Sequence, residues 1–189
     1  LIMDKVAIVI LNWNGCEMLS RYLPSVLASS KQDGVVVYVA DNGSTDNSVE
    51  MLRRDFPLVH LILLNENHGF ADGYNLALKQ VDAEYAVLLN SDVQVSRHWL
   101  EPLLSYMDAH PEVAACQPKI RSLRQPNSFE YAGAAGGYLD KYGYPYCRGR
   151  IMDKVEEDRG QYDSVAPVFW ATGAALFIRL QDYREVGGV

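Results

Sequence analysis

The sequence has little cysteine and no long apolar run. Its three cysteines, Cys16, Cys116 and Cys147, are odd in number and widely spaced, which argues against a disulfide framework or a CxxC zinc site. No stretch approaches the roughly 20 apolar residues that cross a bilayer, and the N-terminus lacks the charged and apolar regions of a signal peptide. These absences predict a cytoplasmic protein in a reducing compartment.

The sequence also lacks positive charge. Seventeen Lys and Arg residues stand against 24 Asp and Glu residues, which gives a net charge of -7 at pH 7. Because proteins hold phosphate backbones with clustered Lys and Arg, this balance argues against nucleic acid as a partner. The length of 189 residues and the hydrophobic share of 49% are typical of one globular domain with a full core.

Short apolar runs alternate with helical patterns between residues 6 and 116. The runs are rich in β-branched and aliphatic residues and cover 6–11, 35–40, 58–64, 85–89 and 113–116. The segments between them repeat apolar residues with the spacing of amphipathic helices. This alternation predicts an α/β, Rossmann-like fold with a mostly parallel central sheet, in which right-handed crossovers place helices on both faces.

The pattern changes near residue 117. Residues 118–163 are rich in glycine, tyrosine and charge and show no sustained period. We expect residues 121–162 to form a loop region less ordered than the sheet, and the alternative is an ordered β-rich subdomain. Residues 165–180 alternate imperfectly and predict a strand or hairpin that returns to the sheet. The single domain, 1–189, therefore divides into halves of about 1–117 and 118–189.

Polar residues follow three of the predicted strands at the point where each strand ends. Asn12-Trp13-Asn14 follows the first strand, Asp41-Asn42-Gly43 the second and Asn90-Ser91-Asp92 the fourth. Parallel α/β sheets bind ligands at the carboxyl ends of their strands, near the point where strand order reverses. The three loops therefore predict one crevice for a nucleotide and a metal.

Three carboxylates lie in or near these loops, and two of them have two interpretations each. Asp41 could accept a hydrogen bond from the N3–H of a uracil or thymine ring, or it could cap its own turn. Asp92 could ligate Mg²⁺ or Mn²⁺, which prefer oxygen ligands and are usually held by one or two carboxylates plus substrate phosphates, or it could cap a turn. Asp46 occupies a helix-capping position, and we expect a structural role for it.

Two later segments add small and aromatic residues. Gly69 and Phe70 open a predicted helix whose first N–H groups could meet an anion, although the segment matches neither a dinucleotide nor a Walker pattern. The glycine could instead let the helix pack closely on the sheet. Trp170 beside Gly173 could form a flat wall for a sugar ring, and core packing is the alternative.

Taken together, residues 6–14, 41–46, 67–71 and 88–92 resemble the family 2 glycosyltransferases with the GT-A fold. The resemblance covers about residues 5–95, and residues 170–188 are similar to the family's later acceptor-side segment. Within the family, the sequence looks most like the rhamnosyltransferase-like branch, in which Asn-x-Asp commonly replaces the Asp-x-Asp metal motif.

The resemblance implies a site for a UDP- or dTDP-sugar. Asp41 would bind the pyrimidine base, flanked by Leu11 and Trp13, and Asp92 would carry the Mg²⁺ or Mn²⁺ that bridges the diphosphate. Asn90 replaces the first acidic residue of the motif, which removes one charge. The remaining residues expected at the donor site are Asn14, Gly69, Phe70 and Ser91.

The resemblance also implies an inverting transfer in cell-surface polysaccharide synthesis. A saccharide or lipid-linked acceptor, on the side of Trp170 and Gly173, would lose its hydroxyl proton to a carboxylate and attack the anomeric carbon in line. In the family, an acidic loop and helix after the segment that matches Gly188 carry this general base. We therefore expect the base beyond Val189, and a truncated catalytic domain with a fold that is incomplete at its C-terminus.

The sequence also predicts two further partners and leaves two other functions open. We expect peripheral association at the inner face of the membrane, and a homodimer formed through apolar surface that absent helices would cover. A nucleotidyltransferase would share the sheet, but residues 12–17 contain no Lys or Arg for its phosphate loop. A non-catalytic nucleotide-sugar-binding domain would use the same site residues.

Overall fold

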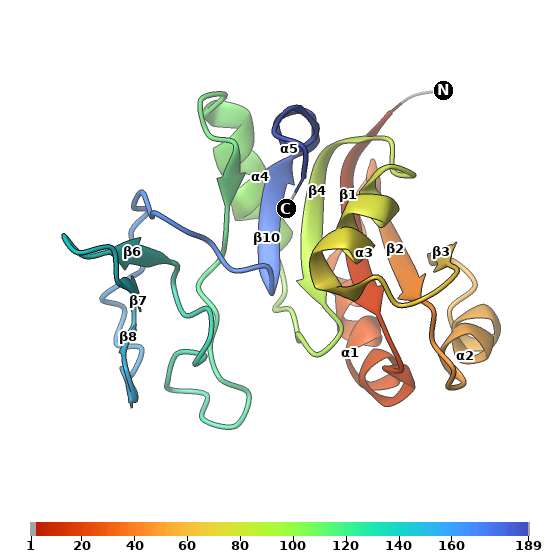
Figure 1. Cartoon of the computed structure of the whole chain (residues 1–189), viewed down its shortest axis with the longest axis horizontal. Coiled ribbons are helices and arrows are strands. Elements are labelled where there is room, and N and C mark those ends of the chain that lie inside the picture. The colour runs from red at the N-terminus through yellow and green to blue at the C-terminus, as the bar shows by residue number, and fades with distance from the viewer. Residues whose placement is uncertain (1–2, 189) are drawn as a thin grey trace.

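The computed structural model describes residues 3–188, which form a large sheet covered by helices and a small sheet at one end (Figure 1). The large sheet has six strands in the order β3-β2-β1-β4-β10-β5. Its strands are β1 (Asp4–Asn12), β2 (Val35–Asn42), β3 (His60–Leu64), β4 (Ala83–Asn90), β5 (Ala115–Cys116) and β10 (Ala175–Arg179). The first four are parallel, and β10 runs antiparallel to β4 and β5. The mostly parallel α/β sheet is therefore confirmed.

Helices cover both faces of the large sheet, as the sequence predicts. They are α1 (Cys16–Ser29), α2 (Ser48–Asp55), α3 (Gly69–Leu78), α4 (Leu100–Ala109) and α5 (Leu180–Glu185). Side chains of α1, α2 and α4 share one buried cluster with one face of the strands, and side chains of α3 and α5 share a second cluster with the other face. This double cover explains why β1 reads as a continuous apolar run, with residues 6–10 buried on both sides.

The end of the large sheet differs from the expected βα repeat. The predicted fifth strand, 113–116, shortens to the two residues of β5 and does not pair with β4. The returning strand β10 takes that place because its buried residues, such as Phe177, offer a longer apolar run than β5 does. The expected return of residues 165–180 to the sheet is confirmed, in antiparallel direction.

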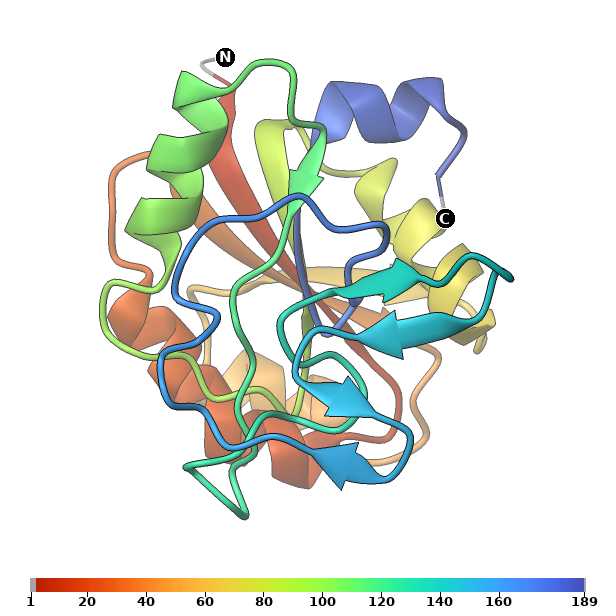
Figure 2. The same cartoon turned by 90° about the vertical axis from the view of Figure 1, so that its left-hand side faces the viewer.

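The small sheet lies within the segment predicted to be an irregular loop. It consists of β6 (Gly137–Leu139), β7 (Pro145–Cys147), β8 (Arg150–Ile151) and β9 (Lys154–Val155), which form an antiparallel meander in that order (Figure 2). Buried Phe129 and Cys147 belong to its own apolar cluster. Residues 137–155 therefore contain strands that the sequence pattern did not indicate, because strands of two or three residues are too short to show a period. The lower order expected for residues 121–162 stays a prediction.

The structure also shows the state of the thiols and the length of the helices. Cys16, Cys116 and Cys147 are all free, and burial raises the pKa of the Cys116 thiol to about 11. Within residues 3–188, no helix is both long and apolar enough to cross a membrane.

Candidate active site

The three polar loops meet at one edge of the large sheet. Asn12 pairs in register with Asp41, and Leu11 pairs with Asn90. Strand order reverses between β1 and β4, because β2 and β3 lie on one side of β1 and the return strand lies beyond β4. The predicted crevice at the carboxyl ends of the strands therefore has the geometry of a topological switch point.

Asp41 is a buried carboxylate at the end of β2, with only 3% of its surface exposed. Its Oδ1 accepts a hydrogen bond from Asn12 Nδ2 at 2.9 Å, and its Oδ2 accepts one from the Ser44 N–H at 3.0 Å. The turn-capping interpretation is thus correct for Oδ2, which accepts the N–H of Ser44. Each carboxylate oxygen can accept a second hydrogen bond, so base recognition by Asp41 stays a prediction.

Asn12 is a site residue that sequence reasoning did not single out. Its side chain is fully buried, and Nδ2 also donates to Ser44 Oγ at 3.2 Å. Its Oδ1 is buried and has no hydrogen-bond partner among the described residues. The signal in the sequence is an amide residue that closes an otherwise apolar buried strand. Asn12 holds the Asp41 carboxylate in place.

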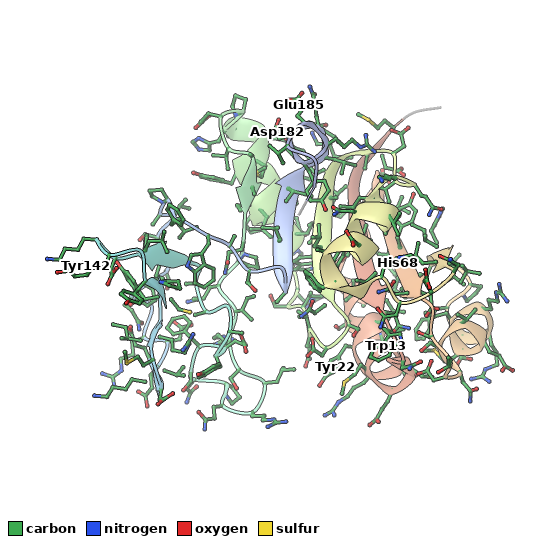
Figure 3. All side chains as sticks on the ribbon, viewed as in Figure 1. Trp13, Tyr22, His68, Tyr142, Asp182 and Glu185 are labelled. Carbon is green, nitrogen blue, oxygen red and sulfur yellow. The ribbon has the colours of Figure 1, made fainter. Side chains whose placement is uncertain are left out.

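Trp13 and Asn14 behave differently in the loop after β1. Trp13 is exposed at the carboxyl edge of the sheet, where Figure 3 shows it on the same side of the molecule as His68. Asn14 Oδ1 accepts the N–H groups of Thr45 at 2.7 Å and of Asp46 at 3.2 Å. Asn14 therefore joins the first two loops, and Trp13 is available to a ligand.

Asp46 connects the starts of two helices. Its Oδ2 accepts the N–H of Cys16, the first residue of α1, at 3.1 Å, and its Oδ1 accepts the N–H of Ser48, the first residue of α2, at 3.0 Å. Partial burial alone would raise the pKa of the Asp46 carboxyl, but the hydrogen bonds from Ser48 and Cys16 lower it below its ordinary value of 3.8. The carboxylate satisfies otherwise unpaired helix N–H groups.

We expect Asp46→Ala to lower the free energy of unfolding by about 1 kcal/mol at pH 7, the usual cost of removing a helix cap. Because the pKa is lower in the folded chain than in the unfolded one, this stabilisation is complete above about pH 5 and is lost as the pH falls through the folded value. Urea denaturation of the variant and the native chain at pH 7 and pH 3 measures it. The difference should shrink at pH 3, and Asp33→Ala, an exposed site, should show none at either pH.

The hydroxyl of Tyr74 anchors α3 to the carboxyl-terminal parts of β1 and β4. This buried residue donates to the Leu89 carbonyl of β4 at 3.1 Å and accepts the N–H of Leu11 in β1 at 3.4 Å. Burial raises its pKa, so the hydroxyl keeps its proton. The side chain of Leu11 packs against Gly73, where an added Cβ would lie 2.9 Å from it. The absence of a side chain at Gly73 therefore lets α3 approach Leu11 of β1 closely.

The start of α3 is fixed by amide side chains. Asn42 Nδ2 donates to the Gly69 carbonyl at 2.9 Å, and the N–H of Gly69 donates to Asn67 Oδ1 at 2.8 Å. The N–H of Gly69 is therefore already bonded, and anion binding by the other N–H groups at the start of this helix stays a prediction. Phe70, which follows, is more than half exposed.

The loop after β4 presents a free carboxylate. The N–H of Asn90 donates to the Ala174 carbonyl at 3.0 Å, and the Asn90 carbonyl accepts the N–H of Val93 at 3.3 Å. Ser91 is half-buried and Asp92 is exposed. Within residues 3–188, no group donates a hydrogen bond to the Asp92 carboxylate, so the turn forms without it. Its oxygens are available to a cation.

The side chains at this edge suit Mg²⁺ or Mn²⁺ only when a bound substrate supplies further oxygen ligands. The described residues contain no group of three or more His, Cys, Asp or Glu side chains that could hold a metal ion. Asp92 and the amide oxygen of Asn90 are hard oxygen ligands, and Mg²⁺ is commonly held by one or two carboxylates plus substrate phosphates. The residues present fit a metal that arrives with a diphosphate.

Trp170 and Gly173 lie on two different surfaces. The indole of Trp170 covers Gly137 of β6, where an added Cβ would lie 1.9 Å from the ring, and it packs on the cluster of Phe129. This packing is the alternative that the sequence left open, and a sugar-stacking role for Trp170 stays a prediction. At Gly173, an added Cβ would lie 2.8 Å from Phe70 Cζ. Gly173 therefore lies beside the donor-side helix.

The sequence model described as Glycosyl transferase family 2 matches residues 7–164. These residues include the three strand-end loops and the small sheet. The chain belongs to glycosyltransferase family 2. The family that the strand-end motifs resemble is thus confirmed.

Similar proteins agree with this family 2 glycosyltransferase assignment. The N-acetylglucosaminyl-diphospho-decaprenol L-rhamnosyltransferase of Mycobacterium tuberculosis is 26% identical over 203 residues, which cover 98% of this chain and 64% of that protein. The chain thus spans less than two thirds of this relative. The general base expected beyond Val189 lies outside the described residues.

Solved structures share the fold of this glycosyltransferase. The mannosyltransferase PcManGT from Pyrobaculum calidifontis, in complex with GDP-Man and Mn²⁺, superposes with a TM-score of 0.67 at 19% sequence identity. The superposition covers 100% of this chain and 49% of the PcManGT chain. S. aureus TarS 1-349 gives a TM-score of 0.64 at 16% identity, with coverage of 96% and 49%. The likeness confirms the GT-A glycosyltransferase fold.

Proposed function

We propose that the chain is the donor-binding part of an inverting glycosyltransferase that takes its sugar from a UDP- or dTDP-sugar. The observation that carries the proposal is the convergence of Trp13, Asp41 and Asp92 at the switch point between β1 and β4. The exposed ring of Trp13 suits a nucleotide base, and the buried, oriented carboxylate of Asp41 suits the N3–H of that base. The free carboxylate of Asp92 suits a metal-bound diphosphate. The name of the relative from M. tuberculosis describes transfer of L-rhamnose to a lipid-linked diphospho-sugar, which supports a lipid-linked acceptor for this chain.

Each site residue has a distinct task in the proposed mechanism. Asp41, held by Asn12 and the N–H of Ser44, accepts the N3–H of the pyrimidine. Trp13 covers the base, and Leu11, backed by Gly73, closes the edge of the base site. Asp92, with Asn90 beside it, would hold a Mg²⁺ or Mn²⁺ ion, and that ion would supply positive charge for the departing diphosphate.

The acceptor side of the proposal rests on the second half of the chain. We assign residues 1–117 to the nucleotide sugar and 118–189 to a saccharide or lipid-linked acceptor, in cell-surface polysaccharide synthesis. The contact between Gly173 and Phe70 supports this division, because it brings the segment before β10 against the donor-side helix. The acceptor hydroxyl still needs a carboxylate within hydrogen-bond reach, and we place that base beyond residue 189.

Calorimetric titration with UDP, dTDP and GDP in the presence of Mn²⁺ tests the base assignment. The native chain should bind the two pyrimidine diphosphates more tightly than GDP, and Asp41→Ala should lose about tenfold or more in UDP affinity, the value of a hydrogen bond to a charged group. Asp41→Asn keeps an oxygen for the N–H of Ser44, so it separates the loss of the charge from the loss of the turn.

The control is Asp33→Asn, which removes a carboxylate before the opposite end of β2. It should bind UDP as the native chain does. Equal affinity of the native chain for GDP and UDP, or native UDP affinity in both Asp41 variants, would show that Asp41 does not read the base.

A further inference from the structure

Two outer turns of the small sheet present large side chains to solvent. Residues 140–144 join β6 to β7, and residues 152–153 join β8 to β9. Tyr142 and Met152 at these turns are 73% and 83% exposed. Alternate turns of an antiparallel meander fall on the same edge of the sheet, and Figure 2 shows both turns projecting to the same side. We call residues 140–144 and 151–154 the turn edge.

Position 152 of the turn edge does not carry a residue type that a turn requires. Tight turns favour Gly, Asn and Asp, because these residues adopt left-handed backbone conformations at low cost. Met152 adopts a φ of 52°, a conformation that is uncommon for a residue with a long side chain. Reversal of the chain therefore does not explain an exposed methionine at this position.

The backbone of the turn edge is braced while its side chains stay outside. Asp140 Oδ1 accepts the N–H groups of Tyr142 at 2.8 Å and of Tyr144 at 2.9 Å. In the second turn, Arg150 Nη1 donates to the Met152 carbonyl at 2.6 Å. These bonds fix the two turns, and the large apolar side chains remain exposed on a defined scaffold.

Charge separates this end of the molecule from the rest. Residues 118–170 contain eight Lys and Arg and seven Asp and Glu, whereas the remaining residues contain nine and seventeen. Lys141 and Lys154 flank the apolar tips, and both are exposed. Asp140 and Asp153 also belong to the turn edge, so its own net charge is zero, and it is better suited to an anionic surface than the acidic body is.

We propose that the turn edge binds the surface of an anionic lipid bilayer. Tyrosine rings suit the boundary between headgroups and acyl chains, Met152 and Ile151 can enter the apolar side of that boundary, and the lysines attract anionic headgroups. The small sheet lies at one end of the long axis, and Tyr142 lies far from Trp13 and His68 (Figures 1 and 3). Attachment there would leave the proposed nucleotide site open to solvent.

Co-sedimentation with lipid vesicles tests the proposal on the chain itself. We expect binding to phosphatidylcholine vesicles that contain about one third phosphatidylglycerol, weaker binding to phosphatidylcholine alone, and a loss of binding in high salt. Lys141→Gln with Lys154→Gln should lower the partition coefficient by about 30-fold, since each lysine near an anionic surface contributes about fivefold. Tyr142→Ser with Met152→Ser should lower it by about tenfold, because two apolar tips leave the interface.

Lys79→Gln and Leu58→Ser are the matched controls, since both residues are exposed on the body. They should bind vesicles as the native chain does, and all variants should keep native UDP affinity, which reports that they are folded. Failure of the native chain to bind anionic vesicles, or equal losses in the controls, would overturn the proposal. Self-association that depends on Tyr142 and Met152 without lipid would also overturn it, because the turn edge would then be an interface between two copies.

Discussion

Asp92→Asn is expected to remove most of the gain in UDP affinity that Mn²⁺ provides to the native chain. The Asp92 carboxylate receives no hydrogen bond from the described residues, so its charge is free for a cation, and the substitution removes the charge with little change in shape. Loss of a group that merely supports a metal ligand typically costs 10–100-fold in metal affinity, so loss of the ligand itself should cost at least about tenfold. Calorimetric titration of UDP with and without Mn²⁺ measures the effect.

Asp82→Asn is the control for this measurement. Asp82 directly precedes β4, at the opposite end of the strand from Asp92, and it is exposed. Its variant should keep the full effect of Mn²⁺. Metal-independent UDP binding by the native chain, or an equal loss in both variants, would argue that the cation does not bind at Asp92.

Phe177→Ala is expected to lower the free energy of unfolding by about 3–5 kcal/mol, the usual cost of emptying a fully buried phenylalanine site. Phe177 is 0% exposed at the centre of β10, and its ring lies 5.2 Å from that of Tyr85 in β4. Urea denaturation gives the free energy, and the melting temperature should fall by roughly 10 °C for a chain of this length.

Phe169→Ala is the matched control, because the same truncation is made at a residue that is 69% exposed. It should change the free energy of unfolding by no more than about 0.5 kcal/mol. If Phe177→Ala were as mild as this control, β10 would not be an integral strand of the sheet.

The parallel half of the sheet could be predicted from sequence because burial on both faces leaves a direct record. Residues 6–10 of β1 are apolar without interruption and are all buried, as a strand between two helical layers requires. The apolar pattern does not show which strand pairs with which. Phe177 reads as a strand residue, but nothing in its segment says that β10 pairs with β4 and displaces β5 from it.

The position of the candidate site could also be predicted from the order of the apolar runs. The hydrogen bonds within the site could not be predicted. Asp41 and Asn90 reach one edge because parallel strands end together, which the order of apolar runs already implies. The bonds of Asn12 and Asn42 depend on which way a buried amide points, and a sequence does not carry that information. The small sheet was missed because Gly149 and its neighbours form turns between strands of two or three residues.

The insertion of β10 between β4 and β5 has a consequence for synthesis of the chain. Among the described residues, β5 pairs only with β10, so neither β5 nor the adjoining edge of β4 has a partner until residues 175–179 leave the ribosome. Roughly 85 residues separate Asn90 from Ala175, which is about 4 to 17 s at ordinary elongation rates. During that interval the nascent chain exposes an unpaired apolar strand edge, so a chaperone that covers β4 should raise the yield of folded protein.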